Sequence, residues 1–198
     1  MREYTIIRKP EPMNWDAVPV AAMDCQPWRT PVENIAAEAR LCYDENYIYV
    51  FLKAKEENIR AEETGPLGSP CEDSCLEFFF SPIEGDQRYF NIEFNPVSCM
   101  YLGFGADRYK SVRLLPEDVF KPEVRYTEDG WQITYAIPVE FVQRFAPDFR
   151  AEPGKTIRGN FYKCGDLTPK RHYLVWNRIG TEAPDYHRPE YFGLLRFA

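Results

Sequence analysis

The stretch Tyr89-Phe90-Asn91-Ile92-Glu93-Phe94-Asn95 alternates apolar and polar residues from Phe90 onward. Successive side chains of a β-strand point to opposite faces of the sheet, so this alternation predicts a strand with one buried face. Its aromatic and aliphatic side chains are expected to face a core, whereas Asn91 and Glu93 are expected to point the other way.

The preceding segment, Ser74 to Ser81, also has the composition of a strand, and a turn-forming stretch at 82–86 separates the two. If they pair as a hairpin, Glu77 shares a face with Asn91 and Glu93. Two carboxylates about 5–10 Å apart are the catalytic apparatus of a glycoside hydrolase. The same face would serve equally well as a polar floor for sugar hydroxyls, or as an ordinary solvated sheet face.

Period-two patterns dominate the rest of the chain, and one stretch, Val139 to Phe145 after Pro138, reads as a short amphipathic helix. Residues 56–70 and 105–121 read as loops. The further expected strands are Ala36–Tyr43, Tyr47–Leu52, Ser98–Phe104, Glu123–Thr127, Trp131–Ile137, Thr156–Cys164, Arg171–Trp176 and Gly193–Phe197. The sequence therefore predicts one all-β domain over 1–198, an antiparallel two-sheet β-sandwich of about ten strands with one short helix.

The overall charge argues against nucleic acid as a partner. The net charge is −7 and the chain lacks a Lys/Arg cluster, whereas affinity for a phosphate backbone depends on cationic side chains. No apolar stretch approaches the roughly 20 residues that span a bilayer. No apolar leader follows Met1, so a cytoplasmic location is expected unless a leader was removed. The oligomeric state is left open.

Motifs for several kinds of chemistry are missing from the sequence. There is no phosphate loop, dinucleotide fingerprint or G-x-S-x-G elbow, so no catalytic residue is predicted from a motif. The six cysteines do not follow a zinc pattern, and most are expected to be reduced thiols. No cofactor is certain. A structural calcium ion, with Glu72 and Asp73 offering oxygen ligands, is one expectation.

Loop aromatics are the other candidates for ligand binding. Tyr186 and His187 lie in the loop Ala183–Pro189, where an aromatic ring can stand on the rim and stack against a pyranose ring. The alternative is a ring that folds back against the end of the sandwich. Trp28 is a second candidate of the same kind.

Five segments, taken in order, resemble the family 9 carbohydrate-binding modules over nearly the whole chain. They are Asn14-Trp15-Asp16, the hairpin from Arg40 to Val50, Glu72-Asp73-Ser74-Cys75-Leu76-Glu77-Phe78-Phe79, Gly130-Trp131 to Ile137-Pro138, and Pro189-Glu190-Tyr191-Phe192-Gly193-Leu194-Leu195. The resemblance implies an antiparallel β-sandwich, often with bound calcium, that holds sugar chain ends between two tryptophans.

The resemblance also implies roles for single residues. Glu77 matches a glutamate that hydrogen-bonds sugar, and Tyr186 falls where the second aromatic residue stands. Asn91 falls where the family has a binding arginine, and Tyr162 where it has a polar side chain. The first tryptophan is replaced by Pro70 or Cys71, and one extra residue separates Asp73 from Glu77.

The main expectation is therefore a non-catalytic carbohydrate-binding module associated with polysaccharide or glycan breakdown. Tyr186, beside His187, would stack on the sugar, while Glu77, Asn91 and either Glu93 or Arg158 would bind its hydroxyls. One alternative is a protein-interaction or structural sandwich that has lost the sugar site. A glycoside hydrolase that uses Glu77 and Glu93 is the third reading.

Overall fold

The computed structural model describes residues 1–28, 32–115 and 120–198. Within these residues the chain is all-β with one short α-helix, α1 (Val139–Gln143), as the sequence predicts. The strands are β1 (Glu3–Arg8), β2 (Ala21–Ala22), β3 (Ala36–Tyr43), β4 (Tyr47–Lys55), β5 (Cys75–Ser81), β6 (Tyr89–Phe94), β7 (Met100–Gly105), β8 (Ser111–Leu114), β9 (Glu123–Thr127), β10 (Gly130–Pro138), β11 (Thr156–Gly165), β12 (His172–Val175) and β13 (Gly193–Phe197). Short 3₁₀ turns occupy Trp15–Ala17, Pro70–Glu72 and Pro189–Tyr191.

The strands form one curled sheet, so the predicted arrangement of two antiparallel sheets is wrong. In the described residues the order is β8-β7-β6-β5-β11-β13-β1-β3-β4-β10-β9, with β12 beside β11 and β2 beside β3. The first half of β1 pairs in parallel with β13, and its last two residues, Ile7 and Arg8, pair in parallel with β3. One strand thus fuses the two halves into a mixed sheet of thirteen strands.

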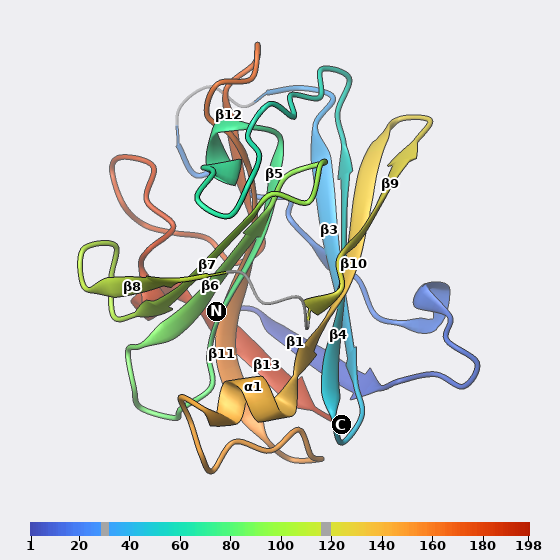
Figure 1. Cartoon of the computed structure of the whole chain (residues 1–198), viewed down its shortest axis with the longest axis vertical. Helices are drawn as coiled ribbons and strands as arrows, with labels where there is room; N and C mark the ends of the chain where they lie inside the picture. Colours follow the sequence, from blue (N-terminus) through green and yellow to red (C-terminus); the bar gives the residue numbers. More distant parts are fainter. Residues whose placement is uncertain (29–31, 116–119) are drawn as a thin grey trace.

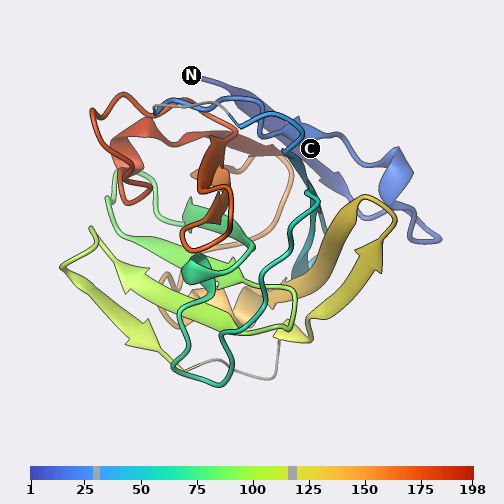
Figure 2. The same ribbon diagram turned by 90° about the horizontal axis from the view of Figure 1, so that it is seen from above.

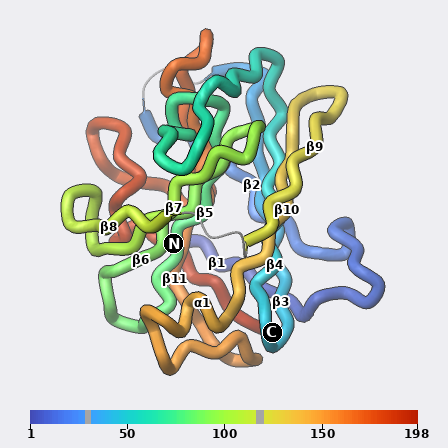
Figure 3. The backbone as a smooth tube through the Cα atoms, viewed as in Figure 1, coloured from blue at the N-terminus to red at the C-terminus, as the bar shows by residue number. Residues whose placement is uncertain are grey.

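The sheet curls so that its two halves face each other around the core. β3, β4, β9 and β10 make the right-hand half, and β5 to β8 with β11 make the left-hand half (Figures 1 and 3). Seen from above, the strands enclose a common interior (Figure 2). Phe78 and Phe161 from one half and Leu41 and Val50 from the other belong to the same buried apolar cluster. Burial of this shared face is the main force that holds the curl.

The alternation along β6 is confirmed. Phe90, Ile92 and Phe94 lie in the core, and Glu93 lies on the outer face of the sheet. Glu93 pairs directly with Glu77 of β5, so the predicted hairpin and its shared polar face are also confirmed. The outer face is not an open solvated surface, because a second apolar cluster around Phe79, Tyr162 and Trp28 covers it.

Several boundaries differ from the prediction. The segment 105–121, predicted as a loop, contains β8, whose half-exposed residues lack a clear apolar face. The helix ends at Gln143 rather than Phe145. The 44–46 turn between β3 and β4 is confirmed, and all six cysteines are free thiols. Among the described residues, no helix is long and apolar enough to cross a membrane.

Candidate functional site

A cleft of about 1240 Å³ lies over the outer face of the sheet near β5, β6, β11 and β12. Strand residues form its floor, and the 182–187 segment borders the floor together with Trp28. Its lining residues are Gln26, Trp28, Cys71, Glu77, Glu93, Arg108, Cys164, Asp166, Arg171, His172, Tyr173, Glu182, Ala183, Pro184, Asp185, Tyr186 and His187. The cleft therefore combines rigid strands below with aromatic and charged side chains around its mouth.

Glu77 and Glu93 are the polar floor of the cleft. They stand directly opposite each other on neighbouring antiparallel strands, where Cβ atoms are about 4.5–5.5 Å apart. Glu77 is only 2% exposed, and its Oε1 accepts a hydrogen bond from the Cys164 thiol at 3.1 Å. Placing two buried acids side by side is costly if both are ionised.

The environment favours the protonated form of both acids. Burial raises the pKa of Glu77 well above its usual range, and the neighbouring Glu93 raises it further. Burial also raises the pKa of Glu93 to about 7, against the lowering effects of Asn91 and Arg108. A protonated carboxyl group both donates and accepts hydrogen bonds, so the floor is suited to hydroxyl groups.

An aromatic wall stands beside the floor. The Trp28 ring contacts Tyr186 and Tyr173, with centroid distances of 5.7 and 5.9 Å. Trp28 is held by a hydrogen bond from its Nε1 to the Thr181 carbonyl oxygen at 3.1 Å. Tyr173, on β12, is half-buried and leaves part of its ring facing the cleft. Such rings can pack on the apolar face of a sugar.

Tyr186 does not stand on the rim, and the expected exposed ring is wrong. The side chain is 7% exposed, and its ring stacks on Tyr162 at 4.1 Å with the planes 7° apart. Its hydroxyl donates to the Lys163 carbonyl oxygen at 3.0 Å. The alternative of a ring folded back on the sheet is thus the observed one, because the Tyr162 face and a buried carbonyl oxygen together satisfy it.

Charged side chains of both signs form the mouth. Arg108 pairs with Asp185 at 3.3 Å. Arg171 lies 3.5 Å from Asp166, whose carboxylate also accepts a hydrogen bond from the Tyr173 hydroxyl. Asp166 at the mouth therefore holds the Tyr173 ring in place.

The structure brings four of the predicted site residues into the cleft, namely Glu77, Glu93, Tyr186 and His187. The other three do not line it. Asn91 is buried beside Glu93, and Tyr162 lies beneath Tyr186. Arg158 lies outside the cleft, where its guanidinium donates to the Glu190 and Phe192 carbonyl oxygens at 3.2 Å.

Sequence reasoning missed Tyr173, Arg108, Arg171 and Asp166 and placed Trp28 second. A signal for Tyr173 was present, because alternation in β12 and its pairing with Cys164 put Tyr173 on the outer face. The remaining three come from loop or turn positions, where no periodic pattern shows direction.

Asp73 does not fit the expected calcium ion. The Asp73 carboxylate is fully buried and pairs with the Arg60 guanidinium. It also accepts hydrogen bonds from the backbone N–H groups of Glu62 and Glu63 at 2.9 and 2.8 Å. These donors occupy the lone pairs that a calcium ion would need.

His187 gives the cleft wall a pH-dependent stability. Its Nδ1 lies 2.8 Å from the Tyr89 hydroxyl, and burial lowers its pKa to about 4, helped by Arg108 and opposed by Asp185 and Asp107. A histidine with a lowered folded-state pKa stabilises the fold above its unfolded pKa, and this contribution is lost as the pH falls. His187→Asn is expected to lower the free energy of unfolding at neutral pH. This difference from the wild-type protein should shrink by about 1 kcal/mol for each pH unit between about pH 6 and pH 4.

Urea unfolding of both proteins across this pH range measures the difference directly. The common titration of the other acids cancels in the comparison. A difference that stays constant with pH would show that His187 is not held neutral in the fold.

With the geometry established, sequence comparison identifies the family. The model of carbohydrate-binding family 9 matches residues 8–197. The chain belongs to carbohydrate-binding family 9. A search of curated proteins finds no match for this family 9 chain.

Solved structures share the fold of the family 9 chain. A protein from Bacteroides uniformis, for which carbohydrate binding is suggested, superposes with a TM-score of 0.82 at 27% identity, covering 98% of this chain and 99% of that one. A family 9 module from Caldicellulosiruptor kristjanssonii in complex with glucose has a TM-score of 0.66 at 10% identity, with 100% and 96% covered. A family 9 module from the same organism in complex with cellotriose has a TM-score of 0.67 at 10% identity, covering 99% of this chain and 93% of that one.

Proposed function

We propose that this chain acts as one non-catalytic module that binds a sugar in the cleft described above. The observation that carries the proposal is the adjacency of an aromatic wall, Trp28 and Tyr173, and a buried carboxyl floor, Glu77 and Glu93. A pyranose ring has an apolar face for the wall and hydroxyl groups for the floor. Family membership supports the same conclusion.

A neutral sugar suits this cleft better than an acidic one. Five carboxyl groups line it, those of Glu77, Glu93, Asp166, Glu182 and Asp185, against the guanidiniums of Arg108 and Arg171. Both guanidiniums are already paired with cleft carboxylates. An added sugar carboxylate would find no unpaired guanidinium in this lining, so no ion pair would offset the loss of its hydration. We therefore propose glucose-type neutral oligosaccharides, as in the Caldicellulosiruptor complexes, with a role beside polysaccharide-degrading enzymes.

Tyr173→Ala is expected to weaken sugar binding through loss of ring stacking. A stacked aromatic ring contributes about 1–3 kcal/mol, so the dissociation constant should rise about 5- to 150-fold. A glycan array on the wild-type protein first identifies the sugar, and calorimetry then compares the variants. Tyr126→Ala is the matched control, because Tyr126 is 60% exposed on β9 in the other half of the sheet.

If the wild-type protein binds no glycan, the proposal fails, and a search for a protein partner becomes the next step. If Tyr126→Ala weakens binding as much as Tyr173→Ala, the cleft is not the site.

Hydrolysis is a second candidate, because Glu77 and Glu93 do converge in the cleft with raised pKa values. Glycoside hydrolases place their two carboxyl groups on either side of the scissile bond. Here both rise from one sheet face in directly paired positions, so they approach a sugar from the same side. Prolonged incubation with cello-oligosaccharides, followed by chromatography, is expected to return intact substrate. Product formation that Glu93→Gln abolishes would establish an enzyme instead.

A further inference from the structure

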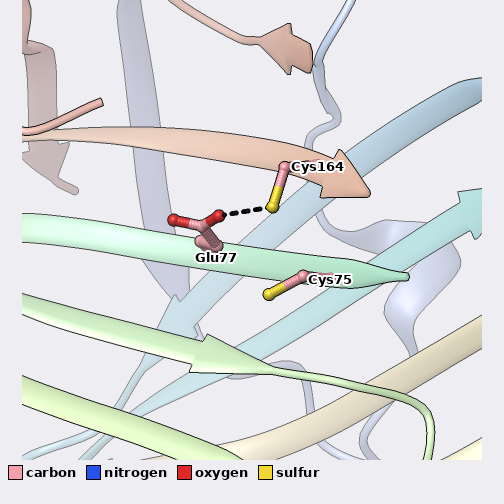
Figure 4. A group of neighbouring side chains, drawn as sticks. All are labelled: Cys75, Glu77 and Cys164. Carbon is pink, nitrogen blue, oxygen red and sulfur yellow. Dashed lines mark hydrogen bonds between the residues drawn. The ribbon is translucent and has the colours of Figure 1, made fainter. Parts of the chain in front are cut away.

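Two cysteines and a glutamate gather at the floor of the cleft, from the two central strands β5 and β11. Cys75 and Cys164 are directly paired across these strands. Glu77 lies two residues along from Cys75, so it projects from the same face of β5. One ligand atom from each residue, two sulfurs and a carboxylate oxygen, lies within 4.8 Å of the other two. Figure 4 shows the three side chains brought together in this way.

We propose that Cys75, Cys164 and Glu77 form a binding site for a thiophilic divalent cation, and that zinc is the ion they suit best. Thiolates select zinc and copper(I) over hard cations such as calcium, and zinc accepts mixed sulfur and carboxylate ligands. Zinc–sulfur bonds of about 2.3 Å put tetrahedral ligands about 3.7 Å apart, which is inside the 4.8 Å within which the three ligand atoms lie. The Cys164 sulfur and the Glu77 oxygen are already 3.1 Å apart.

The surroundings also favour a cation. Glu93 stands directly opposite Glu77 on β6. Asp166 follows Cys164 by two residues and lines the same cleft. A bound divalent ion would offset this concentration of negative charge. The Asn91 side chain, 3% exposed beside Glu93, has a buried Oδ1 with no hydrogen-bond partner among the described residues. A spare oxygen acceptor therefore lies two residues along β6 from Glu93, the residue that pairs with Glu77.

An ion can reach this site through the cleft. Glu77 and Cys164 both line it, whereas Cys75 is fully buried behind them. Three protein ligands on rigid strands would leave a fourth position for water on the cleft side, the arrangement of an open zinc site. The inference does not rest on sugar binding, although Glu77 of the carboxyl floor takes part in both proposals.

Cobalt(II) substitution tests the proposal in the reduced, full-length protein. The wild-type chain is expected to bind one cobalt ion with thiolate-to-metal charge-transfer absorption and tetrahedral visible bands, and zinc should displace it. Each ion should release at least the two thiol protons, detectable with a pH indicator in weak buffer. Cys75→Ala and Cys164→Ala should each lose at least about half of the band. Cys42→Ala, which changes a buried thiol on β3, is the matched control.

X-ray absorption of the wild-type zinc complex counts the ligands without a variant that could misfold. Two sulfur ligands per ion support the site, and any other sulfur count overturns it. Absence of the cobalt band, or a band that survives in the Cys75→Ala/Cys164→Ala double variant, overturns it as well. Glycan binding measured on the same sample without metal separates this result from the proposed function.

Discussion

Glu56→Gln is expected to lower the free energy of unfolding by about 3–5 kcal/mol, because it removes the carboxylate that neutralises a fully buried lysine. Lys163 is 0% exposed, and its Nζ lies 3.1 Å from Glu56 Oε1. The same carboxylate accepts hydrogen bonds from Trp131 Nε1 at 2.8 Å and Ser74 Oγ at 2.9 Å. Trp131 and Ser74 donate to different oxygens of Glu56, so glutamine keeps an acceptor for one of them, and the loss combines the charge with one hydrogen bond.

Within the described part of the chain, Lys163 contacts no other anion. Its Nζ donates to the Cys164 carbonyl oxygen at 2.9 Å and lies 2.7 Å from His172 Nε2. Burial, together with Lys163, lowers the pKa of His172 to about 4, so the imidazole is neutral. Its Nδ1 faces the Lys170 carbonyl oxygen at 2.7 Å and therefore carries the proton, which leaves Nε2 to accept from lysine.

Urea unfolding of a double-mutant cycle measures the coupling between the two charges. Lys163→Met alone should be as costly as Glu56→Gln, since it leaves the carboxylate unpaired. The double variant Glu56→Gln/Lys163→Met should recover most of the loss, because no uncompensated charge remains. Simple additivity of the two single losses would show that the pair is not coupled.

Glu77→Ala is expected to raise the dissociation constant for the bound sugar about 10- to 100-fold, because one or two buried hydrogen bonds to the sugar are lost. The carboxyl group lies at the centre of the cleft floor, where water competes poorly with a ligand. Glu182→Ala is the matched control, because Glu182 lines the same cleft but is exposed at its rim. The dissociation constant of Glu182→Ala should change less than about threefold, because solvent-exposed contacts contribute little free energy.

Calorimetry with the sugar identified on the array gives both constants, and circular dichroism checks that each variant is folded. If Glu77→Ala and Glu182→Ala changed the dissociation constant equally, the floor would not be part of the binding site. An unchanged constant in Glu77→Ala would place the sugar elsewhere on the molecule.

Alternation along two strands was enough to predict the polar floor. In β5 and β6 every second residue is apolar and buried, so the pairing of Glu77 with Glu93 followed from period two and one hairpin. The overall sheet could not be predicted in the same way. β1 pairs in parallel with β13 and β3, and parallel neighbours are separated by long stretches that leave no local turn signal.

The direction of individual aromatic rings could not be predicted from local sequence either. Tyr186 lines the cleft, but the direction of its ring depends on the Tyr162 face and the Lys163 carbonyl oxygen, which come from another strand. Tyr173 lies on a strand whose outer direction was readable from the pattern, yet its role depends on a cleft formed by the 182–187 segment. Tertiary packing, rather than local sequence, decides which rings stay accessible.

The position of β1 has a consequence for synthesis on the ribosome. Glu3 pairs with Leu194, so the seam between the two halves joins residues that are translated almost 200 positions apart. While the intervening strands emerge, β1 has only β3 as a partner, and its other edge is open to incorrect pairing. The sheet can close only after β13 has left the exit tunnel, and contacts of such long sequence separation form slowly. Nascent chains stalled before β13 are thus expected to be the species most prone to aggregation.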